Sequence, residues 1–234
     1  MNPLCSIAAV LALVPALFAG AQQTHAASSP AVTDAGWVKE FTVPWRKLPF
    51  NPNVRQIQGN ENALNWDPRF ALLLQSSFHQ RQWFFRDNDT LAPLADVIQT
   101  YIGVPGDALL DQDRYITADG CVPHVCEDRG MLWIDTGTHP AQVIFVATGD
   151  VNGAQRDTPS NMLWIFSSSK LNWQQLPQPF LDSLHRWRND LVQQDGFTFQ
   201  DGFAIANLVQ PNGEIVTLSP SVLGLQPLST GAKQ

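Results

Sequence analysis

The residues best suited to chemistry gather in one six-residue stretch, Cys121-Val122-Pro123-His124-Val125-Cys126. His124 can donate or accept hydrogen bonds, and the two cysteines can bond to each other. A disulfide that closes so short a loop contributes only about 2 kcal/mol through chain entropy, so it shapes the loop more than it stabilises the fold. Pro123 fixes one further backbone angle, so His124 would lose little entropy on binding a partner. Two interpretations stay open, a histidine presented to a partner and a structural turn.

A metal site is another use for the same side chains. Cys121, His124 and Cys126 are all residue types that bind zinc. A structural zinc site needs four ligands, and no second Cys/His pair has matching spacing; the nearest further donor is His139. In an oxidising compartment a disulfide is favoured over metal-bound thiolates. No metal or other cofactor is therefore predicted.

Motifs typical of enzymes are missing from the sequence. There is no Gly-x-Ser-x-Gly elbow, no His-Glu-x-x-His, no phosphate-binding glycine loop and no dinucleotide fingerprint. Asp119, Glu127 and Asp128 flank the loop and could imitate an acid/base pair, but carboxylates beside a turn are usually solvated. The chain is not predicted to be an enzyme.

The N-terminal segment has the features of a secretory signal. No charged residue precedes Asp34, and residues 6–20 form an apolar run that ends in small residues. The run is shorter than the roughly 20 residues that span a bilayer, although a short membrane anchor is the alternative. We predict a signal peptide over 1–26. Its removal leaves two cysteines, an even number that suits an oxidising compartment.

Charge and composition limit the partners. The net charge of −7 favours neither nucleic acid nor anionic lipid, and it would attract a basic protein. Charged residues make up only 15% of the chain, and the chain contains eight tryptophans. This composition suits a packed domain rather than a disordered tail. No nucleic-acid or membrane partner is predicted.

The part of the chain before the cysteine loop is predicted to form an arm followed by two helices. Residues 27–60 are punctuated by proline and asparagine and predict an extended N-terminal arm. Asp67-Pro68 has the pattern of an N-cap followed by proline in the first turn, and it begins a predicted amphipathic helix over 68–84. A second short helix is expected over 94–101, ended by Gly103.

From residue 113 onward the pattern changes to short runs rich in β-branched and aromatic residues, each bounded by turn residues. Their spacing is too short for crossover helices, so it predicts antiparallel pairing. A further helix is expected to begin at Pro179 and to end before Gly196. Two more strands follow, joined by the turn Pro211-Asn212-Gly213. The predicted strands cover 114–117, 130–135, 142–148, 162–168, 203–209 and 214–218.

The segments around the loop have an order met in a known family. Tyr115-Ile116-Thr117-Ala118-Asp119-Gly120 precedes the loop and Met131-Leu132-Trp133-Ile134-Asp135 follows it, with Leu163-Trp164 and the stretch 171–180 further on. This resembles the Ivy family, inhibitors of vertebrate (c-type) lysozyme that Gram-negative bacteria export. The family carries Cys-Lys-Pro-His-Asp-Cys at the loop. The resemblance covers residues 65–190 and is specific at the loop.

The resemblance implies a fold and a location. We expect a single α+β domain over 61–225, with an antiparallel sheet of about five strands, helices packed on one face and a protruding, disulfide-closed loop. Residues 226–234 are expected to form a flexible tail. The protein is expected in the periplasm, and because family members can be dimeric, a homodimer stays open.

The resemblance also gives the loop residues roles. His124 would enter the cleft of a lysozyme or other muramidase and contact its two catalytic carboxylates, Pro123 would set its direction, and Cys121 and Cys126 would close the loop. An imidazolium with two N–H donors can bridge such a pair of carboxylates. The family's Lys and Asp are replaced by Val122 and Val125. The alternative is therefore an envelope protein that binds a non-enzyme partner through an apolar loop.

Overall fold

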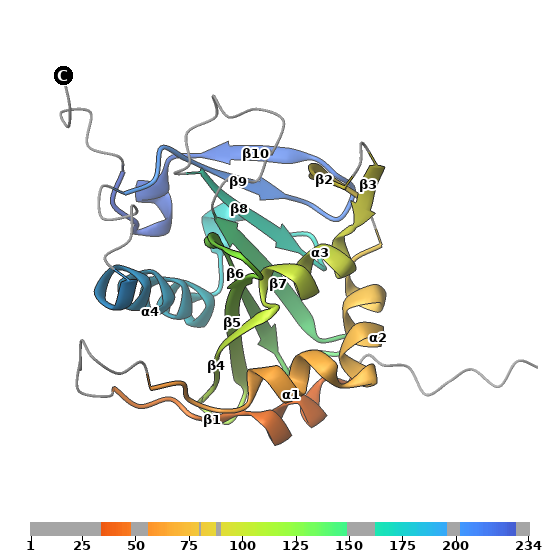
Figure 1. Cartoon of the computed structure of the whole chain (residues 1–234). Coiled ribbons are helices and arrows are strands. Elements are labelled where there is room, and N and C mark those ends of the chain that lie inside the picture. Colours follow the sequence, from red (N-terminus) through yellow and green to blue (C-terminus); the bar gives the residue numbers. More distant parts are fainter. Residues whose placement is uncertain are drawn as a thin grey trace, which may run out of the picture. The chain divides into compact units, whose positions relative to one another are not determined.

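A mixed eight-stranded β-sheet is the main element of the computed structural model (Figure 1). Its strand order is β1-β4-β5-β6-β7-β8-β9-β10. The structure describes residues 34–47, 56–79, 81–87, 90–148, 162–195 and 202–227. The predicted signal peptide over 1–26, Gly196 and residues 228–234 of the predicted tail lie outside these ranges, whereas Pro227 forms a β-bridge with Phe203.

The sheet strands pair in both directions. Pairing is antiparallel from β4 through β8 and between β9 and β10, which confirms the prediction for the central strands. β1 is parallel to β4, and β9 is parallel to β8. The strands are β1 (Val43–Pro44), β4 (Val104–Asp111), β5 (Tyr115–Val122), β6 (Val125–Asp135), β7 (Gln142–Thr148), β8 (Met162–Ser167), β9 (Ile205–Val209) and β10 (Ile215–Leu218).

The sheet is therefore larger than the expected five strands, and it is mixed rather than purely antiparallel. α4 lies between β8 and β9 in the chain, and a connection of that length lets two neighbouring strands run parallel. Part of the N-terminal arm adds β1 at one edge, and β10 extends the other. β2 (Arg81–Asp87) and β3 (Thr90–Pro93) form a separate two-stranded sheet.

Local sequence signals set several helix boundaries. Asp67 caps α2 by accepting a hydrogen bond from the Arg69 N–H, and Pro68 occupies the first turn. α2 ends at Ser77, earlier than the predicted 84, and β2 follows it. α3 matches its predicted range, and Ile102 caps it just before Gly103. The helical elements are η1 (Gly36–Phe41), α1 (Glu61–Trp66), α2 (Pro68–Ser77), α3 (Leu94–Tyr101), η2 (Trp173–Gln175), α4 (Gln178–Asp195) and η4 (Pro220–Leu223).

Two hydrophobic cores cover the two faces of the sheet. On β6, Leu132 and Ile134 pack with η1 and α1 to α3, whereas Met131 and Trp133 pack with α4. Alternate residues of a strand point to opposite faces, so this strand is buried on both sides. Figure 1 shows α4 on the opposite side of the sheet from α1 to α3. The expectation that helices cover only one face is wrong.

No helix within the described ranges is long and apolar enough to cross a membrane.

Candidate functional site

The predicted loop is the tip of the hairpin between β5 and β6. Val122 pairs with Val125, so Pro123 and His124 alone form the turn. His124 has a φ of 68°. Proline fixes a negative φ at the second turn position, so a positive φ at the third identifies a type II turn. A residue other than glycine is disfavoured there by roughly 1–2 kcal/mol, and the closed hairpin holds His124 in that conformation.

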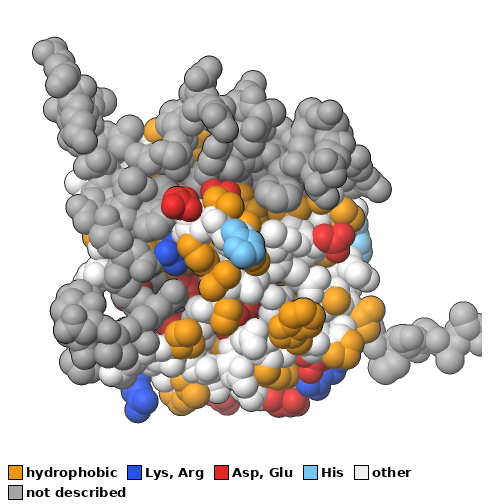
Figure 2. Space-filling model, in the orientation of Figure 1, with side chains coloured by type: hydrophobic (Ala, Val, Ile, Leu, Met, Phe, Trp, Pro, Cys, Tyr) orange, Lys and Arg blue, Asp and Glu red, His pale blue; other side chains and the backbone are white. Residues whose placement is uncertain are grey.

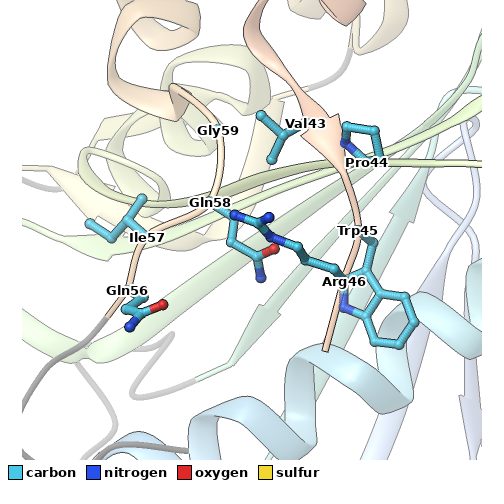
Figure 3. Close-up of a pocket in the computed structure, with 8 residues that line it drawn as sticks. All are labelled: Val43, Pro44, Trp45, Arg46, Gln56, Ile57, Gln58 and Gly59. Carbon is cyan, nitrogen blue, oxygen red and sulfur yellow. The ribbon is translucent and has the colours of Figure 1, made fainter. Parts of the chain in front are cut away.

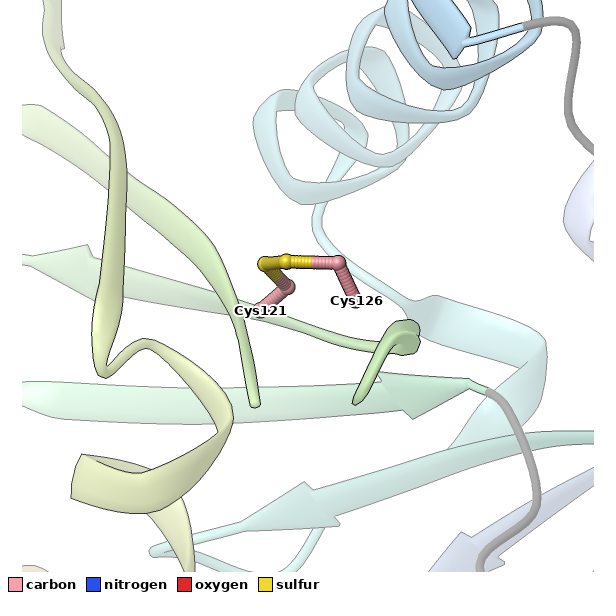
Figure 4. Close-up of a disulfide and its surroundings, with 2 residues drawn as sticks. All are labelled: Cys121 and Cys126. Atoms are coloured by element: carbon pink, nitrogen blue, oxygen red, sulfur yellow. A yellow bond between two sulfur atoms is a disulfide. The ribbon is translucent and has the colours of Figure 1, made fainter. Parts of the chain in front are cut away.

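A disulfide joins Cys121 on β5 to Cys126 on β6 (Figure 4). Their Cα atoms are 4.9 Å apart. Cys121 is opposite Arg129 while the next residue is opposite Val125, so the ladder register skips three residues of β6, 126–128. The disulfide therefore ties the strands together where their ladder is interrupted. Both thiols are used, so this pair does not bind zinc as thiolates.

Exposure differs along the loop. Pro123, His124 and Val125 are exposed, and Val125 retains 43% of its surface. Val122 is only 9% exposed and belongs to the core under α3. The interpretation that both valines make the tip apolar is therefore wrong for Val122. Figure 2 shows hydrophobic side chains beside a histidine near the middle of one face.

The three carboxylates near the loop do not share one environment. Asp119 accepts a hydrogen bond from the Asp107 N–H, Asp128 is buried, and Glu127 is exposed. Among the residues that the structure describes, no three His, Cys, Asp or Glu side chains are grouped so that they could hold a metal ion.

A fourth carboxylate, Glu61, was missed from the sequence. It opens α1, where a glutamate is normally solvated, yet it is 1% exposed. Neither of its oxygens has a hydrogen-bond partner among the described residues. Burial, and then repulsion by Asp119, raises its pKa from 4.5 to about 8. Glu61 is therefore largely protonated at neutral pH.

Two surface cavities are lined mostly by uncharged residues within the described part of the chain. The cavity of about 470 Å³ in Figure 3 has Trp45 and Ile57 on its walls, and Arg46 is the charged residue among its described lining residues. A cavity of about 280 Å³ is rich in hydroxyl groups, but those of Ser76 and Thr138 donate to backbone carbonyls. Among their described lining residues, neither cavity combines an acid with a base.

Comparison of the chain with protein-family models, with curated proteins and with solved structures finds no match. Within the described residues, the feature that points most directly to a function is the β5–β6 hairpin. It combines an exposed His124, a two-residue turn and a disulfide across an interrupted ladder.

Proposed function

We propose that this chain is an exported, Ivy-like inhibitor of a lysozyme-like glycosidase, and that His124 enters the target's active-site cleft. The observation that carries the proposal is the exposed His124 at the tip of a disulfide-closed, two-residue turn. A histidine needed only for packing would not be placed there.

The shape of the tip suits a cleft that holds two carboxylates. Glycosidases keep their catalytic carboxyls roughly 5–9.5 Å apart. An imidazolium has donors on two sides of its ring and can bridge such a pair through charge-assisted hydrogen bonds. Pro123 and the Cys121–Cys126 disulfide restrict the backbone beforehand, so little conformational entropy is lost on binding.

Charge and the exposed valine define the partner further. A net charge of −7 complements a basic muramidase and would speed the encounter at low salt. Val125 is the only exposed valine of the loop and would contact an apolar part of the cleft rim. We also propose a periplasmic location, because residues 1–26 have the pattern of a signal peptide.

Inhibition assays test the proposal. Purified protein is titrated against c-, g- and i-type lysozymes at low salt, beside His124→Ala and Cys121→Ser/Cys126→Ser. We expect His124→Ala to raise Ki about 100-fold or more, as for a central contact residue. His139→Ala is the matched control, because His139 is also exposed and adjacent to a proline but lies beyond the other end of β6.

Two results would contradict the proposal. Either the wild type inhibits none of these enzymes, or His124→Ala and His139→Ala are equally potent. The first would favour the alternative, an envelope protein that binds a non-enzyme partner through Val125.

A further inference from the structure

The C-terminal end of α3 lies directly on the β5–β6 hairpin, close to the tip. Gly120 and Gly130 are cross-strand partners, so they share one face of the sheet. A Cβ atom on Gly120 would lie 2.8 Å from the Ile102 Cα, and one on Gly130 would lie 2.8 Å from the Tyr101 Cβ. Only a pair of glycines lets the end of the helix approach the two strands this closely.

The same segment reaches the tip of the hairpin through Gly103. A Cβ atom added to Gly103 would lie 3.1 Å from both Cδ and Cγ of Pro123. The Gly103 N–H donates to the Thr100 carbonyl, so the turn that ends α3 fixes the position of Gly103. Pro123 therefore packs against a backbone that the helix holds in place.

The tip needs this support because the strand ladder gives it little. Residues 126–128 have no opposite residue in the β5 ladder, so on the tip side of this interruption the ladder consists of the Val122–Val125 pair. His124 also occupies the left-handed region, which a non-glycine residue leaves readily unless its neighbours are fixed. The disulfide holds one side of the tip, and the contact between Pro123 and Gly103 holds another.

We propose that Gly103 is a positioning residue for His124: by lacking a side chain, it seats Pro123 against the end of α3 and so sets the direction in which the histidine points. The proposal rests on the proposed function, because it explains how the inhibitory histidine is aimed. Gly103 itself does not need to touch the target.

A double-mutant cycle tests this role. Gly103 is not in the positive-φ region, so the backbone tolerates alanine. A Cβ atom on Gly103 would also lie 3.1 Å from the Thr100 carbonyl oxygen, a contact that is the same in both backgrounds and cancels in the cycle. We expect Gly103→Ala to raise Ki about 10-fold in the wild type but clearly less when Pro123 is already alanine, because the displaced ring atoms are gone. Gly36→Ala, at the start of η1, is the matched control. Its Cβ would likewise lie 3.1 Å from a neighbouring atom, the Asp34 Oδ1. Equal losses in both backgrounds, or no loss at all, would overturn the proposal.

An NMR readout separates this proposal from the function on which it rests. In the wild type we expect nuclear Overhauser contacts between the Gly103 Hα and the Pro123 ring protons. Gly103→Ala should shift the His124 ring and Val125 methyl signals while Trp133 stays unchanged, and Gly36→Ala should move none of them. If the wild type inhibits no muramidase, these signals still decide the positioning role. Absence of the wild-type contacts overturns it, even if the alanine variant fails to fold.

Discussion

The two ends of the β5–β6 hairpin use their charged and titratable side chains differently. At the open end, Arg114 donates two hydrogen bonds to Asp135, with Nε–Oδ1 at 2.6 Å and Nη2–Oδ2 at 2.8 Å. The guanidinium also lies over the ring of Tyr115, which stacks on Trp133. Burial alone would raise the pKa of Asp135, but the hydrogen bonds from Arg114 and from the Gly137 N–H bring it below its ordinary value.

Away from that end, the hairpin exposes a histidine and repels a buried carboxylate. His124 is exposed in a left-handed conformation, and Glu61 is buried close to Asp119 without a hydrogen-bond partner among the described residues. Strained backbone and unpaired polar groups lower stability, and folds keep them mainly where they serve a purpose. The contrast teaches that residue type alone does not mark a site. Arg114 and Asp135 have equally reactive side chains, but the fold already uses them.

The largest expected effect on stability comes from Glu61→Gln. Folded Glu61 keeps its proton up to a pH of about 8, whereas the unfolded chain releases it near 4.5, so wild-type stability falls as pH rises through this window. At pH 7 the glutamine variant should be more stable by roughly 2–4 kcal/mol. Urea unfolding from pH 5 to 9 measures this. Glu127→Gln, which changes an exposed carboxylate at the same end, is the control. Equal pH dependence of wild type and Glu61→Gln would show that Glu61 is not buried as described.

Asp135→Ala tests the open end of the hairpin, where Arg114 and Asp135 form an ion pair. Removing the carboxylate leaves the Arg114 and Gly137 donors without their acceptor, and we expect a loss of about 1–3 kcal/mol in the free energy of unfolding. Because the pKa of Asp135 is lowered in the fold, its contribution is present above the unfolded value and disappears as pH falls through the folded one. Inhibition by the folded variant should not change. A stable Asp135→Ala variant that has lost potency would break the distinction between the two ends.

Val125→Ser is expected to have the smallest effect on stability, within about 0.5 kcal/mol, because the side chain is already 43% exposed. The change in Ki caused by the same substitution measures how much the apolar tip contributes to binding. Val122→Ser is the matched variant, and it should destabilise the fold because Val122 lies in the core. Similar unfolding curves for the two variants would contradict the difference in burial.

Much of the fold could be predicted from local patterns. The cap at Asp67, the end of α3 before Gly103, the range of β7 and the turn at Gly213 all follow from residue preferences that act over a few positions. Burial of β7 on both faces also has a sequence signal, since 143–147 is a continuous apolar run rather than an alternating one. A local sequence signal for the packing of α3 near the site was also present. Gly120 and Gly130 lie inside strands, which indicates close approach of another backbone.

The sequence by itself determined the chemistry of the loop, because the order of cysteine, proline, histidine and cysteine limits which bonds and turns can form. Only the tertiary structure decided which of these side chains is presented. Val122 and Val125 are the same residue type within one loop, yet one is in the core and the other is exposed. The ionisation of Glu61 and the contact of Pro123 with Gly103 likewise depend on segments distant in sequence. Burial and charge interactions are properties of the packed chain, and no local pattern encodes them.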